Sequence, residues 1–222
     1  CVDDLAKDYS VLLYDKRGHG LSGLGQTPYI IDNHVNDLIA LMDKLEISNA
    51  LLVGLSVGGL IVQGVYHSRP DLVCGLVLCD TAAKIGNETM WNDRIEIARN
   101  GGLEALLEAN MQRWFSPNFH KNNQIELRGY EAMFSRTPLE GYIGTGTAIR
   151  DADFTSKASS ISVPTTCVVG EYDGATNPEL VEGTAKLIPG SKFEVIKNAG
   201  HIPCAEQPKE IIQIIRQMIA II

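Results

Sequence analysis

The stretch Ala50–Gly59, ALLVGLSVGG, decides the fold of this chain. Its first six residues are a short apolar run typical of a buried strand, and the residues after Ser56 favour a helix. A serine between glycines at such a turn is exposed and strained, and the helix beginning at Val57 directs backbone N–H groups toward developing negative charge. We therefore predict that Ser56 is a nucleophile and that the Val57 N–H is an oxyanion donor. A glycine-rich turn without chemistry is the alternative.

The same stretch lies inside twenty uncharged residues, 47–66, which is long enough for a transmembrane helix. Polar side chains and four glycines interrupt this run, which favours a strand followed by a helix and predicts no membrane association.

The whole chain has 222 residues, a net charge of -8 and no basic run, which argues against a nucleic-acid partner. Five widely spaced cysteines with no metal-ligand spacing predict free thiols, no metal and a cytoplasmic location.

Short apolar runs alternate with helical stretches along the chain. The runs that predict strands are 10–14, 50–55, 74–79, 165–169 and 192–196, and helices are expected at 30–45, 57–67, 178–187 and 208–221. This alternation is typical of an α/β fold with a mostly parallel sheet, in which polar loops follow the carboxyl ends of the strands.

The segment 83–150 is far longer than an ordinary connection between a helix and a strand. Spaced apolar residues predict helices at 88–99, 102–115, 123–134 and 139–149, with Pro117 and Pro138 among the breaks. We expect a helical cap, residues 83–150, inserted into a core formed by residues 1–82 and 151–222.

A nucleophilic serine needs a base and an orienting carboxylate. Asp173 and His201 each lie in a loop just after a predicted strand, and the order Ser, Asp, His is that of an α/β-hydrolase. Taken singly, Asp173 could start a turn and His201 could cap a helix. Asp80 also ends a strand and is the rival carboxylate. His19 is expected to make a structural hydrogen bond, and the remaining histidines lie in predicted helices or in the cap.

These residues resemble the 3-oxoadipate enol-lactonases of the α/β-hydrolase superfamily, from about Tyr9 to the final helix. The features shared by the whole superfamily are YDKRGHG (14–20), GLSVGG (54–59) and Gly200-His201. More specific are LVLCDTAAKIG (76–86), WNDRIEIARNGGLEAL (91–106), RWFSP (113–117) and RDADF (150–154). The resemblance implies opening of a small, carboxylate-bearing enol-lactone to 3-oxoadipate in aromatic-compound catabolism, by a Ser-His-Asp acyl-enzyme mechanism without metal or organic cofactor.

An anionic lactone or ester substrate needs a local cation in a chain of charge -8. We expect Arg94 to bind its carboxylate, with Trp91 and Trp114 shaping the pocket. Arg113 and Arg128 are alternative cations, and packing of the cap is the alternative role for the tryptophans.

Two other functions remain open. One is a general small-ester carboxylesterase or perhydrolase, which uses the same triad. The other is a non-catalytic ligand-binding protein. The sequence leaves the oligomeric state unknown.

In the α/β-hydrolase pattern the second oxyanion donor follows an earlier strand. We therefore expect N-terminal strands to be missing and about 35 to 45 residues to precede Cys1.

Overall fold

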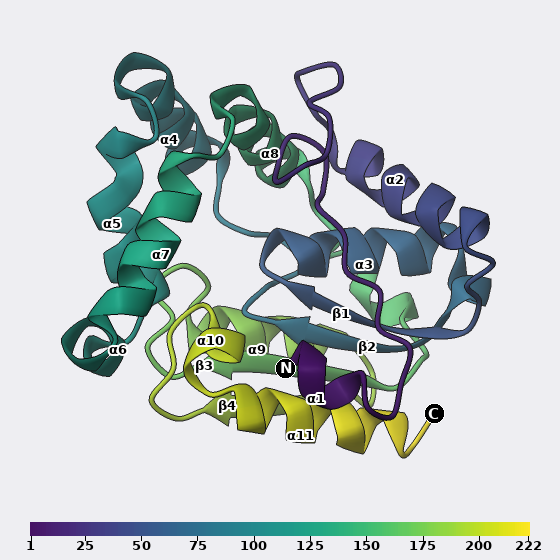
Figure 1. The fold of residues 1–222 in the computed structure, drawn as a ribbon. Coiled ribbons are helices and arrows are strands. Elements are labelled where there is room, and N and C mark those ends of the chain that lie inside the picture. The colour runs from purple at the N-terminus through teal and green to yellow at the C-terminus, as the bar shows by residue number, and fades with distance from the viewer.

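The computed structural model describes residues 1–222 and contains one four-stranded parallel sheet (Figure 1). Its strands, side by side in chain order, are β1 (Ala50–Leu55), β2 (Val73–Cys79), β3 (Thr165–Gly170) and β4 (Lys192–Ile196). The helices of the core are α1 (Val2–Leu5), α2 (Ile31–Lys44), α3 (Val57–Ser68), α9 (Pro178–Leu187), α10 (Pro203–Glu206) and α11 (Pro208–Ile219). The predicted α/β class and parallel sheet are confirmed.

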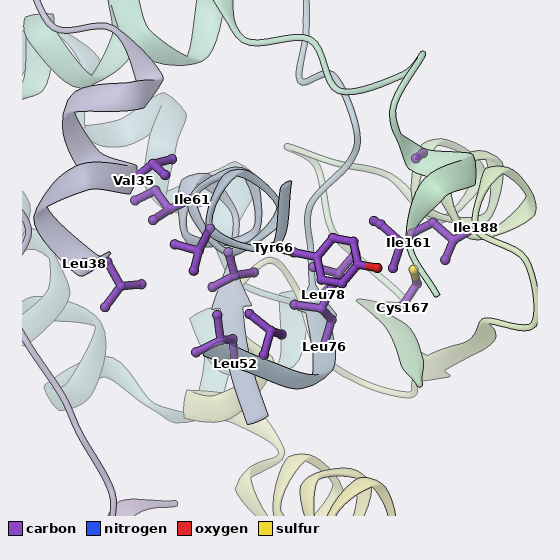
Figure 2. Packing of buried hydrophobic residues seen from close by; sticks show 14 of the residues in the cluster. Val35, Leu38, Leu52, Ile61, Tyr66, Leu76, Leu78, Ile161, Cys167 and Ile188 are labelled. Atoms are coloured by element: carbon purple, nitrogen blue, oxygen red, sulfur yellow. The ribbon is translucent and has the colours of Figure 1, made fainter. Parts of the chain in front are cut away.

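Apolar residues cover both faces of the sheet, because side chains alternate along each strand. In β2, Leu76 and Leu78 face a cluster with residues of α2, α3 and α9, which Figure 2 shows from close by. Val77 and Cys79 of the same strand face a second cluster with residues of α1 and α11. The central strands β2 and β3 are therefore buried between two helical layers, as their nearly continuous apolar sequences require.

The predicted strand at residues 10–14 is wrong. This segment is extended, but it makes no backbone hydrogen bond to any strand of the sheet. Its apolar side chains are exposed, including 67% of Leu13. A β-branched and apolar composition suits a strand, but a strand forms only where a neighbour supplies the hydrogen-bonding partners. β1 pairs with β2 alone and is one edge of the sheet.

The expected helical insertion lies between β2 and β3 and is confirmed as α4 (Glu88–Gly101), α5 (Glu104–Trp114), α6 (Pro117–Asn122), α7 (Gln124–Ser135) and α8 (Leu139–Asp151). Helices α4 to α7 stand together beside one end of the sheet (Figure 1), around an apolar cluster that also includes Ile143 of α8. Sequence reasoning missed α6 because it treated Pro117 as a break. Proline instead occupies the first position of α6, and the Ser116 side chain caps it by accepting the Phe119 N–H at 3.2 Å.

The uncharged run 47–66 is divided between β1 and α3. Among the helices of the structure, none combines the length and the apolar character that crossing a membrane requires.

Candidate active site

Ser56 occupies the sharp turn between β1 and α3. Its backbone has φ 55° and ψ -118°, a strained conformation for a residue with a side chain. The carbonyl of Ser56 accepts a hydrogen bond from the Thr81 hydroxyl at 2.7 Å, and its N–H donates to Cys79 at 3.0 Å. These two bonds to the neighbouring strand and its loop hold the turn in place. Val57, the predicted oxyanion donor, is the first residue of α3.

Close backbone approach explains two glycines at this turn. A Cβ on Gly54 would lie 2.4 Å from the carbonyl oxygen of Gly58, and one on Gly59 would lie 2.3 Å from the Thr81 side chain. Gly58 itself has open space at that position. The turn therefore requires Gly54 and Gly59 for packing.

Asp173 and His201 form a buried hydrogen-bonded pair. Asp173 follows β3 and His201 follows β4, and Nδ1 of His201 lies 2.9 Å from Oδ2 of Asp173. The same Oδ2 accepts the Thr176 hydroxyl at 2.7 Å, while Oδ1 accepts the N–H groups of Ala175 and Thr176. The Asp173 side chain is fully buried, and that of His201 is 5% exposed. With Nδ1 bound to the carboxylate, only Nε2 of the imidazole remains free for a proton transfer.

Charge is divided unequally between the two buried aspartates at this edge. Burial favours the neutral form of Asp173, but hydrogen bonds with His201 and Thr176 outweigh burial and lower the pKa of Asp173. Burial, followed by the nearby charge of Asp173, holds the pKa of Asp80 well above its ordinary value. Oδ1 of Asp80 accepts the Gly170 N–H at 2.8 Å, and Oδ2 has no partner. Asp80, the rival carboxylate of the sequence prediction, is thus next to the pair but does not contact His201 through a hydrogen bond.

The three predicted catalytic residues follow β1, β3 and β4, whose carboxyl ends share one edge of the sheet. Only Asp173 and His201 are joined by a hydrogen bond; the Ser56 hydroxyl makes none to His201. Asp80, Asp173 and His201 are also the one group of acidic and histidine side chains close enough together to bind a metal ion.

The insertion holds an arginine with no carboxylate partner. Arg94 of α4 donates through Nη2 to Oδ1 of Asn110 at 2.6 Å and to the Tyr142 hydroxyl at 3.0 Å, and its Nε is buried without a partner. Its guanidinium carbon lies 5.4 Å from the ring of Trp91. A cation held by neutral groups is free to pair with an anionic ligand. Asn110 and Tyr142 were missed by the sequence analysis, because nothing in their spacing distinguishes them from other cap residues.

The two predicted pocket tryptophans and the two alternative cations occupy different places in the insertion. Trp91 donates from Nε1 to the Ile85 carbonyl at 2.8 Å, and Trp114 packs edge-on against Phe134. Arg113 is half-buried; burial, then the charge of Arg94, lowers its pKa. Arg128 is exposed. Arg94 and Arg113 are therefore close enough to interact, whereas Arg128 lies on the outside of the insertion.

The remaining histidines lie outside the pair. His19 and His120 contact backbone carbonyls, of Arg17 at 3.3 Å and of Met111 at 3.0 Å. His34 and His67 lie in α2 and α3.

A family model described as the alpha/beta hydrolase fold matches residues 1–208. The chain belongs to the α/β-hydrolase family. It is 34% identical over 216 residues to 3-oxoadipate enol-lactonase 1 of Acinetobacter baylyi, covering 96% of this chain and 79% of that protein. These matches confirm the resemblance that the sequence motifs predicted.

Two solved structures are similar over 99% of this chain. The enol-lactonase from Burkholderia xenovorans has a TM-score of 0.95 at 33% identity, and 84% of it is covered. A thermophilic esterase from Thermogutta terrifontis, with malate bound, has a TM-score of 0.93 at 28% identity, and 82% of it is covered. This α/β-hydrolase is thus related both to enol-lactonases and to esterases.

Proposed function

We propose that this α/β-hydrolase opens a small carboxylate-bearing enol-lactone, 3-oxoadipate enol-lactone, to give 3-oxoadipate. The observation that carries the proposal is Arg94, a cation of the insertion whose hydrogen bonds go to Asn110 and Tyr142 and to no carboxylate. A substrate carboxylate would complete the coordination of this guanidinium. The similarity to enol-lactonases at 33% and 34% identity supports the same substrate class.

Ser56, His201 and Asp173 are assigned to the acyl-transfer steps. Nε2 of His201 takes the Ser56 proton as the hydroxyl oxygen attacks the lactone carbonyl, and Asp173 stabilises the imidazolium that forms. The Val57 N–H donates to the tetrahedral oxyanion. Collapse breaks the ring C–O bond and expels an enolate oxygen, which takes the proton from His201, and the enol tautomerises to the ketone.

The second half of the reaction releases the acid. A water molecule gives its proton to Nε2 of His201 and attacks the acyl carbonyl, and the bond to the Ser56 oxygen breaks as that oxygen recovers the proton. Each proton taken by His201 is returned, so the residues regenerate themselves and the step needs no cofactor.

A general small-ester hydrolase, including perhydrolase activity, is the second candidate. The similarity to the Thermogutta terrifontis esterase supports it, and the malate bound to that esterase is itself a carboxylate. A non-catalytic ligand-binding protein is the third candidate function.

We also propose a cytoplasmic location, which the five free cysteines support.

The discriminating experiment compares turnover of the enol-lactone with that of neutral esters of similar size. The proposal expects the larger kcat/KM on the enol-lactone. A larger value on the neutral esters would favour the general esterase, and stoichiometric binding without turnover would favour the binding protein.

A further inference from the structure

One carboxylate, that of Glu206, binds both the loop that carries His201 and the helical insertion. Glu206 is the last residue of α10, and its Oε1 accepts the Gly200 N–H at 2.7 Å. The N–H of Ser116 donates to both carboxylate oxygens at 3.2 and 3.3 Å, and the Ser116 hydroxyl also donates to Oε2. Glu206 thus links Gly200, the residue before His201, to Ser116, which directly precedes α6.

Main-chain contacts run beside this link. The N–H of His201 donates to the Trp114 carbonyl at 2.8 Å, and the N–H of Gly174 donates to the Arg113 carbonyl at 3.1 Å. A Cβ on Gly200 would lie 2.5 Å from the Trp114 oxygen, so the two backbones are in direct contact. The segment 113–116 therefore touches both loops that carry the buried pair.

The Glu206 carboxylate forms no ion pair. Its hydrogen bonds come from two backbone N–H groups and one hydroxyl, and no lysine or arginine lies within 4.0 Å of its carboxylate. Hydrogen bonds from neutral donors to a carboxylate are stronger than those between neutral groups. Ser116 is fully buried and Glu206 is half-buried.

Aromatic contacts extend the same segment toward the arginine site. Trp114 packs edge-on against Phe134, and Phe134 packs edge-on against Tyr142, whose hydroxyl accepts from Arg94. Groups that would contact a substrate carboxylate and the backbone that holds His201 are therefore parts of one packed unit.

We propose that Glu206 is a positioning residue that fixes the His201 loop to segment 113–116, so that the insertion sets the place of the imidazole. The proposal deepens the proposed function and depends on His201 acting as the base. Displacing a reacting group by about 1 Å costs up to about 10²-fold in rate. Loss of the link should therefore lower kcat while leaving KM, which Arg94 and its partners govern, little changed.

The test compares Glu206→Ala and Glu206→Gln, assayed on the enol-lactone below the melting temperature of each variant. Glu206→Ala is expected to lose about 10 to 10²-fold in kcat with KM within about threefold of wild type. Glu206→Gln keeps one oxygen that accepts from Gly200, so it should recover part of that loss.

Glu171→Ala is the matched control. Glu171 accepts the Asn198 N–H at 3.1 Å from the same loop and binds Lys197 at 2.9 Å, but it does not contact the insertion. Its kcat should stay within about twofold of wild type. Wild-type kcat in Glu206→Ala, equal losses in Glu206→Ala and Glu171→Ala, or no recovery in Glu206→Gln would each overturn the positioning role.

Ser56→Ala separates this proposal from the one on which it depends. Full turnover in Ser56→Ala would overturn both. Abolished turnover in Ser56→Ala together with wild-type kcat in Glu206→Ala would overturn the role of Glu206 alone.

Discussion

Asp80 and Asp173 place their carboxyl groups within 4.8 Å of each other, at the ends of the neighbouring strands β2 and β3. Two ionised carboxylates at this distance in a buried site would repel strongly. The pKa of Asp80 is raised well above its ordinary value, by burial first and then by Asp173, whereas the pKa of Asp173 is lowered. The opposite directions of these two shifts place the negative charge on Asp173, beside His201, rather than on Asp80.

Replacing Asp80 or Asp173 by asparagine should have different effects on stability and on kcat. Burial raises the pKa of Asp80 in the folded chain above that in the unfolded chain, so ionisation of Asp80 lowers stability once the pH exceeds the unfolded pKa. Asp80→Asn is therefore expected to raise the free energy of unfolding at pH 7, measured in urea, and to keep most of kcat. Asp173→Asn should lose about 10⁴-fold in kcat. The reverse pattern of kcat losses would assign the orienting carboxylate of the triad to Asp80.

Removing the guanidinium of Arg94 should discriminate between charged and neutral substrates. Arg94→Ala is expected to reduce kcat/KM for a carboxylate-bearing lactone or ester by about 10 to 10²-fold, as for a lost charged hydrogen bond. A neutral ester should lose much less. Arg128→Ala is the control, because Arg128 is exposed on the outside of the insertion. Equal losses on both substrates would contradict the carboxylate-binding role.

Lys16 makes stability depend on pH above neutrality. Burial lowers its pKa to about 7, and the only hydrogen bond of its ammonium group is to the Thr145 hydroxyl at 3.5 Å. Below pH 7 the lysine is charged in both folded and unfolded chains, and the full burial penalty applies. As pH rises from about 7 toward the unfolded pKa of about 10.4, the unfolded chain binds more protons, so stability rises.

Lys16→Met should therefore be more stable than wild type at pH 7 and should lack this rise. Urea unfolding at several pH values between 6 and 10 measures it. Lys7→Met, whose lysine side chain is 70% exposed, is the control and should keep the wild-type profile. If the free energy of unfolding of the wild type and of Lys16→Met changed with pH in parallel, Lys16 would not titrate between pH 6 and 10.

The two glycines flanking Ser56 in the motif should respond differently to an added methyl group. Gly54→Ala pushes a Cβ to 2.4 Å from the Gly58 oxygen, so it should lower the free energy of unfolding by about 1–3 kcal/mol. Gly58→Ala meets no atom within 4 Å and lies in α3, so it should raise stability by up to about 1 kcal/mol. Urea unfolding of the two variants side by side would refute the packing argument if both behaved alike.

The sequence was informative where apolar periodicity and turn chemistry agree. β1, β4 and α9 begin and end at the predicted residues, because polar, glycine or proline residues mark the ends of each apolar pattern. The segment 10–14 has the same local character, but its strand would need a pairing partner, which local composition does not reveal. Local patterns therefore predict elements better than they predict pairing.

The same distinction between local pattern and tertiary contact applies to the residues of the candidate site. Asp173 and His201 were found from their loops after strands, a position set by topology, and the structure brings them together. Asn110, Tyr142 and Glu206 were missed because their roles come from tertiary contacts across 16, 48 and 90 residues of chain. No short-range pattern records such contacts.

The central claim is that Ser56 performs hydrolysis of a carboxylate-bearing lactone, and one measurement tests it most directly. The rate of 3-oxoadipate formation from its enol-lactone is compared between the wild-type chain and Ser56→Ala under multiple-turnover conditions. We expect turnover by the wild type and a loss of about 10⁶-fold in kcat in Ser56→Ala. Turnover in Ser56→Ala equal to that of the wild type would contradict it.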